Sequence, residues 1–263
     1  KRYRTPIIRA KYNNRTYNFY SDQEFEIFKN RHNNVTGAYF KGLGVHDDKN
    51  RREMAAQFFN DIVNINYDSE GERLLHILYG ESTALRKEML IRFDKCQLRL
   101  YKDNLNVTLS EHMLNEALAE QNNNIERMTP NIYDGLMSVH RKVLYLLRLS
   151  AQYKKKMTVS ALGGFVKGLM NYNHGEASIE GTIKRMAQTI QGANWFPLIL
   201  SMSASNGSLD GGRNDTAAGR YTNVCANPFL DYYYPIEDDY LLDYVEEEGE
   251  TYEPVYYISI VPR

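Results

Sequence analysis

Two short stretches of the sequence carry side chains that can act on a phosphate group. Arg220 and Tyr221 place a guanidinium beside a phenol, and His174 supplies an imidazole. A phenol has a reference pKa of about 10, so it becomes a nucleophile only when a nearby cation or base activates it. A guanidinium can hold a phosphate through two hydrogen bonds, and its charge favours phenolate over phenol. Taken alone this is weak evidence, because the chain has 21 tyrosines and a single histidine is more often a hydrogen-bonded core residue.

The other basic candidates also have ordinary structural explanations. The segment Lys41-Gly-Leu-Gly44 lacks the spacing of a phosphate-binding loop and is typical of a glycine turn after a strand. Arg141 and Lys142 resemble a solvated pair on a helix, and residues 154–156, all lysine, fit a turn between helices. Each of them indicates function only in the context of the whole pattern.

Composition restricts the class of protein without assigning a function. A chain of 263 residues, 43% of them hydrophobic, can fill one or two cores, and a net charge of −1 gives no sign of a nucleic-acid partner. Cys96 and Cys225 form no metal-binding or disulfide pattern, which fits a reducing compartment. No stretch approaches the roughly 18 apolar residues of a membrane span. The first residues enter a strand-like segment without a signal peptide, so we expect a piece of a larger protein.

The distribution of charge is more informative than its total. Residues 138–221 hold 11 Lys and Arg against 4 Asp and Glu, whereas residues 222–263 hold 1 against 10. A basic segment followed by an acidic one is the asymmetry expected when one surface meets a polyanion. Two solvated surfaces of opposite sign explain the counts equally well.

The first 65 residues are typical of the end of an α/β domain. Residues 6–20 alternate β-branched or aromatic residues with polar ones and predict two strands joined at Asn13-Asn14. Ser21 and Glu24 have the capping-box spacing of a helix start.

Two further elements complete this region. A short strand ending in a glycine turn is predicted over 39–44, and a helix is predicted over 48–64, where Met54, Phe58 and Ile62 lie four apart.

The rest of the chain is mainly helical. Residues 66–107 predict a linker with helical stretches near 72–79 and 83–93, and Thr108 with Glu111 forms the capping box of a longer helix. Further helices are predicted from Ser138, after Thr158, and over 176–191.

Short helices, a Gly/Ser/Asn/Asp-rich stretch over 203–212, and strand-like residues after Tyr221 fit a winged-helix domain. Residues 227–263 are acidic and rich in tyrosine, and a strand is predicted at Val255–Val261.

The order of these motifs resembles the DNA breakage-reunion core of type IIA DNA topoisomerases, in the eukaryotic and large-DNA-virus form. Residues 129–145 are similar to the family pattern IPNxxDGLKPxQRKVLY, residues 173–183 to HHGExSLxxTI, and residues 206–221 to NGxFGxRxxGGKDAAxxRY. The segments 39–44 and 253–257 look like YYKGLG and EPEWY. The resemblance covers nearly the whole chain in family order.

The sequence departs from these patterns at several positions. The glycine loop before Tyr221 is short and lacks FGxR. Asn173 replaces the first histidine of HHGE, His140 replaces the usual Gln, and Arg213-Asn214 replaces the Lys of GGKD.

The resemblance implies a mixed α+β fold and a site. Residues 1–65 would be the C-terminal part of a TOPRIM α/β domain, 66–107 a linker, 108–226 a mainly helical winged-helix domain, and 227–263 the start of a tower-like region. The implied catalytic residues are Tyr221, Arg220 and His174, and the implied DNA contacts are Arg141, Lys142, Lys41 and Arg213.

The resemblance also implies partners and cofactors. Tyr221 would attack double-stranded DNA and form a 5′-phosphotyrosine, in a homodimer that cuts both strands. Mg²⁺ would be held by acidic residues upstream of this chain and ATP by a domain outside it, so the chain by itself would be catalytically incomplete. The location would be the nucleus, or the host cell or virion for a viral protein.

Three other interpretations remain open at this point. The chain could be a winged-helix module that only binds DNA, another phosphotyrosine-forming DNA cutter, or a structural subunit with degenerate motifs. Formation of a covalent adduct with DNA would distinguish the DNA-cutting enzymes from a module that only binds DNA. ATP-dependent strand passage would distinguish a type II topoisomerase from another phosphotyrosine-forming cutter.

Overall fold

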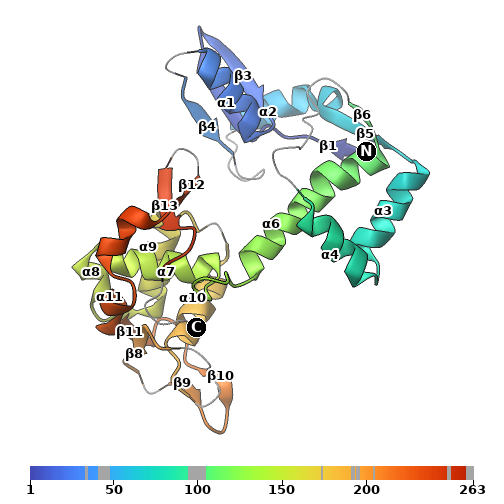
Figure 1. Ribbon diagram of the computed structural model, residues 1–263. Coiled ribbons are helices and arrows are strands. Elements are labelled where there is room, and N and C mark those ends of the chain that lie inside the picture. Colours follow the sequence, from blue (N-terminus) through green and yellow to red (C-terminus); the bar gives the residue numbers. More distant parts are fainter. Residues whose placement is uncertain are drawn as a thin grey trace. The chain divides into compact units, whose positions relative to one another are not determined.

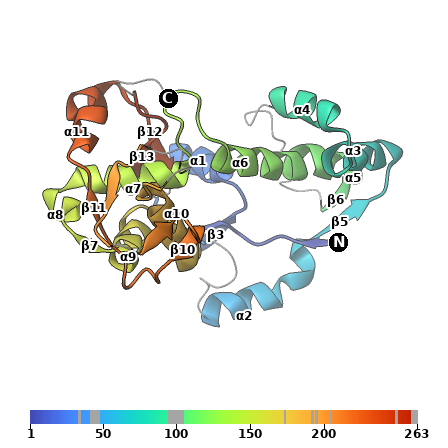
Figure 2. The same ribbon diagram turned by 90° about the horizontal axis from the view of Figure 1, so that it is seen from below.

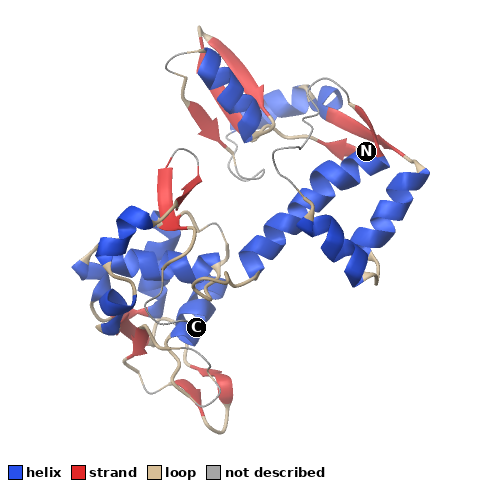
Figure 3. Ribbon diagram, in the orientation of Figure 1, coloured by secondary structure: helices blue, strands red, loops and turns tan. Residues whose placement is uncertain are grey.

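A computed structural model describes residues 1–32, 35–40, 48–93, 105–172, 174–190, 193, 196–203, 205–247 and 250–258. The chain divides into two compact units, Lys1–Asn124 and Ile125–Arg263 (Figure 1). Figure 3 shows that strands and helices occur in both units, as expected for a mixed α+β chain.

A three-stranded antiparallel sheet and one helix form the first core. The strands β2 (Ile8–Tyr12), β3 (Arg15–Phe19) and β4 (Gly37–Tyr39) are ordered β3-β2-β4, and helix α1 (Asp22–Arg31) follows β3. The apolar sheet face packs on α1, and the buried core consists of Ile8, Ala10, Phe19, Phe25 and Val35.

The predicted hairpin and helix start are both confirmed. Asn13 and Asn14 have φ of 48° and 58°, the left-handed conformation that a tight two-residue hairpin turn requires at both positions. The Ser21 side chain accepts a hydrogen bond from the Glu24 amide at 3.2 Å, and the Glu24 carboxylate accepts one from the Tyr20 amide at 2.9 Å.

The helix predicted over 48–64 is wrong in its second half. Helix α2 (Asp48–Ala56) is followed by a 3₁₀ turn, η2 (Phe58–Asp61), and then by strand β5 (Ile62–Asn66). β5 pairs with β1 (Arg2–Tyr3) and β6 (Asn106–Thr108), and Val63 is buried. The β-branched residues of β5 favour a strand that pairs on both of its sides, and this pairing outweighs the four-residue spacing that suggested a helix.

A helical layer completes the first unit. Its helices are α3 (Ser69–Tyr79), α4 (Thr83–Ile91), α5 (Leu109–His112), the π-helical turn η4 (Met113–Ala117) and the first part of α6 (Leu118–Met128), whose residues from Ile125 on belong to the second unit. The two helical stretches predicted within 66–107 and the capping box at Thr108 are confirmed. The second unit begins at Ile125, whereas the predicted domain boundary lies at 107–108. The difference arises because Met113 and Leu118 pack against Leu74 and Leu78 of α3.

The second unit is built on four helices. They are α7 (Ser138–Leu149), α8 (Ala151–Lys154), α9 (Val159–Leu169) and α10 (Glu176–Met186) (Figure 2). Thr158 caps α9 as predicted. Ser138 is the first helical residue and Met137 is the N-cap, and α10 ends five residues before the predicted Gln191.

Short strands lie against these helices. β7 (Met157–Thr158), β11 (Asn223–Ala226) and β8 (Ile199–Ser201) form an antiparallel sheet ordered β7-β11-β8, and β9 (Asn206–Ser208) pairs with β10 (Gly212–Thr216). The core joins Leu144 and Leu147 of α7 with Ile183 of α10 and Val224 of β11, each at most 1% exposed.

The acidic end of the chain folds back on α7. It contains α11 (Phe229–Tyr233), η5 (Ile236–Leu241), and the hairpin of β12 (Tyr244–Glu247) and β13 (Glu250–Pro254), with β13 beside α7. The strand predicted at Val255–Val261 is not observed over 255–258, and 259–261 lie outside the described residues. Within the described part of the chain, none of the helices has the length and apolar character needed to cross a bilayer.

Candidate active site

The pair Arg220–Tyr221 lies on a tight turn between β10 and β11. The amides of Tyr221 and Thr222 both donate to the Ala218 carbonyl, at 2.9 and 3.2 Å. Tyr221 is 64% exposed, and the Arg220 guanidinium carbon lies 4.8 Å from the centroid of its ring. The turn therefore presents a phenol and a cation together at the surface of the second unit.

Main-chain hydrogen bonds tie this turn to the start of α9. The first amides of a helix lack partners within the helix. Here the Val159 amide donates to the Thr222 carbonyl at 2.9 Å, and the Ser160 amide donates to the Gly219 carbonyl at 3.3 Å. The position of the tyrosine backbone is thus set by the start of α9 and by strand β11.

A carboxylate from α10 packs beneath the same turn. Glu180 hydrogen-bonds the Ser160 hydroxyl, and a Cβ added to Gly219 would lie 2.5 Å from the Glu180 carboxyl carbon. Position 219 therefore accepts only glycine without displacement of the turn or of Glu180. This support could not be predicted from the sequence, because a single glutamate on a predicted helix has no spacing that marks it.

His174 lies just before α10, one residue ahead of its N-cap Gly175. It is exposed, its Nε2 atom lies 3.5 Å from Nη1 of Arg127, and its ring meets that of Tyr172 edge-on at 5.3 Å. The structure brings Arg220 and Tyr221 together, and the recorded contacts of His174 are with other residues. Its convergence on the same phosphate stays a prediction.

Arg213 lies on β10 of the hairpin that carries the glycine-rich loop. Its side chain is exposed, and its backbone carbonyl accepts a hydrogen bond from the side-chain Nε2 of Gln188 at 2.7 Å. Gly207 and Gly212 have φ of 97° and 71°, which explains why glycine occupies these positions. The hairpin is anchored to the end of α10 while Arg213 remains available for a ligand.

The predicted contact of Arg141 and Lys142 with DNA needs correction. Both residues are only 7% exposed. Nη1 of Arg141 lies 3.1 Å from the Asp134 carboxylate, and Nζ of Lys142 lies 2.8 Å from that of Glu253. The amphipathic pattern of α7 did not reveal these two acidic partners, of which Glu253 is 111 residues distant. The two cations hold segments of the second unit together.

The last predicted DNA contact, Lys41, lies outside the described residues. Among the described residues, no three His, Cys, Asp or Glu side chains gather as a possible metal site.

Comparison with known proteins identifies relatives along the entire chain. The family model for the A-type subunit of DNA gyrase/topoisomerase IV matches residues 127–263, and that of the C-terminal associated domain of TOPRIM matches residues 3–125. The chain is similar to DNA topoisomerase 2 of African swine fever virus, with 31% identity over 100% of this chain and 23% of the relative. DNA topoisomerase 2 of Drosophila melanogaster is 30% identical over 98% of the chain and 19% of the relative.

A solved structure gives the same result. The DNA-binding, cleavage and re-ligation domain of Plasmodium falciparum topoisomerase II superposes with a TM-score of 0.83 at 27% identity, covering 99% of this chain and 36% of that one. The chain spans about a quarter or less of the length of the curated relatives it matches.

Proposed function

Because the chain belongs to the DNA gyrase/topoisomerase IV family, we propose that it is the DNA-cleaving core of a type II DNA topoisomerase, with Tyr221 as the nucleophile. One observation carries this assignment. The exposed phenol of Tyr221 lies under the guanidinium of Arg220, on a turn whose backbone is fixed to α9.

The proposed step exchanges one phosphodiester for another. The Tyr221 oxygen attacks a backbone phosphorus and loses its proton to a base or to water. The bond from phosphorus to the 3′ oxygen breaks, and that oxygen takes up a proton. Arg220 holds the phosphate and stabilises the charge that develops on it. Religation is the reverse step, and it needs no ATP because the phosphodiester energy is retained in the 5′-phosphotyrosine.

The full reaction needs groups beyond the described residues. We propose that His174, Arg213 and Lys41 also contact the DNA, and that magnesium ligands and an ATP-binding domain lie in other parts of the complete protein. We further propose a homodimer, since cutting both strands takes two tyrosines. The protein would be located in the nucleus, or in the infected cell if it is viral.

A covalent trapping experiment tests the nucleophile. The full-length protein that contains this chain is mixed with supercoiled DNA and Mg²⁺ and denatured with detergent, and protein-linked DNA is measured. We expect Tyr221→Phe to abolish the adduct and to leave duplex binding intact, because only the phenol oxygen is lost. Tyr240→Phe, at a tyrosine that is 95% exposed in the same unit, is the matched control and should form the adduct normally.

The possible outcomes separate the interpretations. An adduct that persists in Tyr221→Phe means that another residue is the nucleophile. Salt-sensitive DNA binding with no adduct from the wild-type protein would instead support a non-enzymatic winged-helix module.

A further inference from the structure

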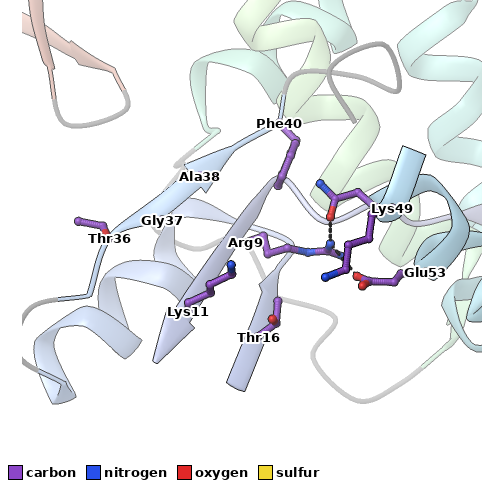
Figure 4. Close-up of a pocket in the computed structure, with 10 residues that line it drawn as sticks. Arg9, Lys11, Thr16, Thr36, Gly37, Ala38, Phe40, Lys49 and Glu53 are labelled. Atoms are coloured by element: carbon purple, nitrogen blue, oxygen red, sulfur yellow. Dashed lines mark hydrogen bonds and ion pairs between the residues drawn. The ribbon is translucent and has the colours of Figure 1, made fainter. Parts of the chain in front are cut away.

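A basic pocket lies in the first unit, on the polar face of sheet β3-β2-β4. Its volume is about 440 Å³, and its lining includes Arg9, Lys11, Phe40, Lys49, Asn50 and Glu53. Figure 4 shows the lining residues on the three strands, on the segments next to β4, and on α2. The volume is within the range of small-molecule sites, roughly 300–1,000 Å³.

Strand alternation explains why this face of the sheet is polar. Successive residues of a strand point to opposite faces, so Ile8 and Ala10 enter the core with α1, and Arg9 and Lys11 take the other face. Lys11 pairs across the strands with Thr16. An apolar face and a cationic face therefore result from one five-residue strand.

Positive charges outnumber negative charges in the lining of the pocket. Arg9 is the most enclosed cation, with its side chain 11% exposed; it donates to Asn18 at 2.9 Å and reaches Glu53 on α2 at 3.0 Å (Figure 4). Lys11 and Lys49 are exposed, and neither has an ion pair recorded among the described residues.

The acidic residues nearby do not neutralise this excess of positive charge. Glu53 already pairs with Arg9, and Asp48 lies 3.5 Å from Arg51. Three cations thus face one carboxylate in the lining, and the two lysines remain for an anion.

We propose that this pocket binds a soluble phosphate-bearing ligand of nucleotide size. Lys11 and Lys49 would contact the phosphates beside the fixed guanidinium of Arg9, and the ring of Phe40 would contact a planar base. A concave site of this volume suits a compact anion better than the convex backbone of a duplex. The proposal is independent of strand cleavage, because no lining residue is among those proposed to act on or contact the DNA.

Calorimetry with the 263-residue chain tests the proposal, with pyrophosphate and ADP as the probes. We expect saturable binding of both at one site. Lys11→Ala and Lys49→Ala should each weaken both probes by roughly tenfold or more, the effect of losing one charge-assisted hydrogen bond. Phe40→Ala should weaken ADP and leave pyrophosphate unchanged. Lys87→Ala, at an exposed lysine on α4, is the matched control for charge and should bind as wild type.

Three results would overturn the proposal. Pyrophosphate and ADP could fail to saturate, or the Lys11 and Lys49 variants could bind both probes as tightly as wild type. Alternatively, only a short duplex could bind in a manner that depends on these lysines, which would assign the pocket to DNA backbone. None of these results bears on the adduct at Tyr221.

Discussion

Replacement of Lys142 by alanine tests whether this residue is a DNA contact or an internal support. Nζ of Lys142 donates to the Glu253 carboxylate at 2.8 Å and to the Met170 carbonyl at 2.9 Å. The two charged side chains are 9% and 2% exposed. Truncation of the lysine leaves the carboxylate buried with Ser138 as its remaining recorded partner, at 2.8 Å.

The expected loss of stability is large. Breaking a buried ion pair by removing one partner costs about 3–5 kcal/mol. For a unit of this size each kcal/mol lowers Tm by roughly 3–5 °C, so we expect a fall of about 10–20 °C in thermal unfolding. Lys155→Ala, at an exposed lysine of the same unit, should stay within about 0.5 kcal/mol of wild type.

A double variant separates lost charge balance from lost packing. Lys142→Met combined with Glu253→Leu removes both charges and keeps apolar volume, so it should recover most of the stability that Lys142→Ala loses. A double variant as unstable as the single one would show that the ion pair itself is needed.

The salt dependence of duplex binding tests the alternative, in which Lys142 contacts a DNA phosphate. A lysine that neutralises one phosphate contributes about one unit to the slope of log K against log salt. We expect Lys142→Ala, measured well below its Tm, to keep the wild-type slope. A slope lower by one unit together with an unchanged Tm would refute the assignment of Lys142 to the core.

Three other substitutions test the two units. Gly219→Ala places a Cβ 2.5 Å from the Glu180 carboxyl carbon, and this carboxylate is the far end of a flexible side chain that can move aside, so adduct yield and Tm should both stay close to wild type; a large fall in adduct yield would mean that Glu180 is needed in its present position. Ile183→Ala, at a fully buried core position, should cost about 2–5 kcal/mol in denaturant unfolding, and a cost below 1 kcal/mol would contradict the packing described here. Burial and the hydrogen bond to Asp61 raise the pKa of Tyr20 to about 12. The folded state therefore holds this proton more tightly than the unfolded state, and stability should be lost as pH rises from 10 to 12. Tyr20→Phe should flatten that loss in alkaline unfolding curves, and an unchanged curve would contradict the assignment.

Local signals in the sequence predicted local structure well. The turn at Asn13-Asn14, the capping box at Thr108 and the start of α9 at Thr158 depend on residues a few positions apart, and all three are observed. The strand β5 was missed because it is stabilised by pairing with β1 and β6, which lie far away in the sequence. The helix predicted over 48–64 was extended too far because Phe58 and Ile62 continue the four-residue spacing of Met54, although they lie in a 3₁₀ turn and a strand.

The same contrast between local signals and long-range contacts applies to the candidate site. Adjacent residues Arg220 and Tyr221 could be paired from the sequence, because a dipeptide needs no long-range contact to bring its side chains together. The partners of Arg141 and Lys142 could not, since charge and helical position do not reveal that Asp134 and Glu253 fold over them. Glu180 was missed for the same reason.

The way in which the second unit holds Tyr221 also makes that position suitable for chemical labelling. Its recorded hydrogen bonds use main-chain atoms, and most of its ring is in solvent. Fluorinated tyrosines could therefore be incorporated there without repacking, and they would vary the acidity of the phenol in graded steps. The rate of strand scission against that acidity would then report how much negative charge the oxygen carries as it bonds to phosphorus.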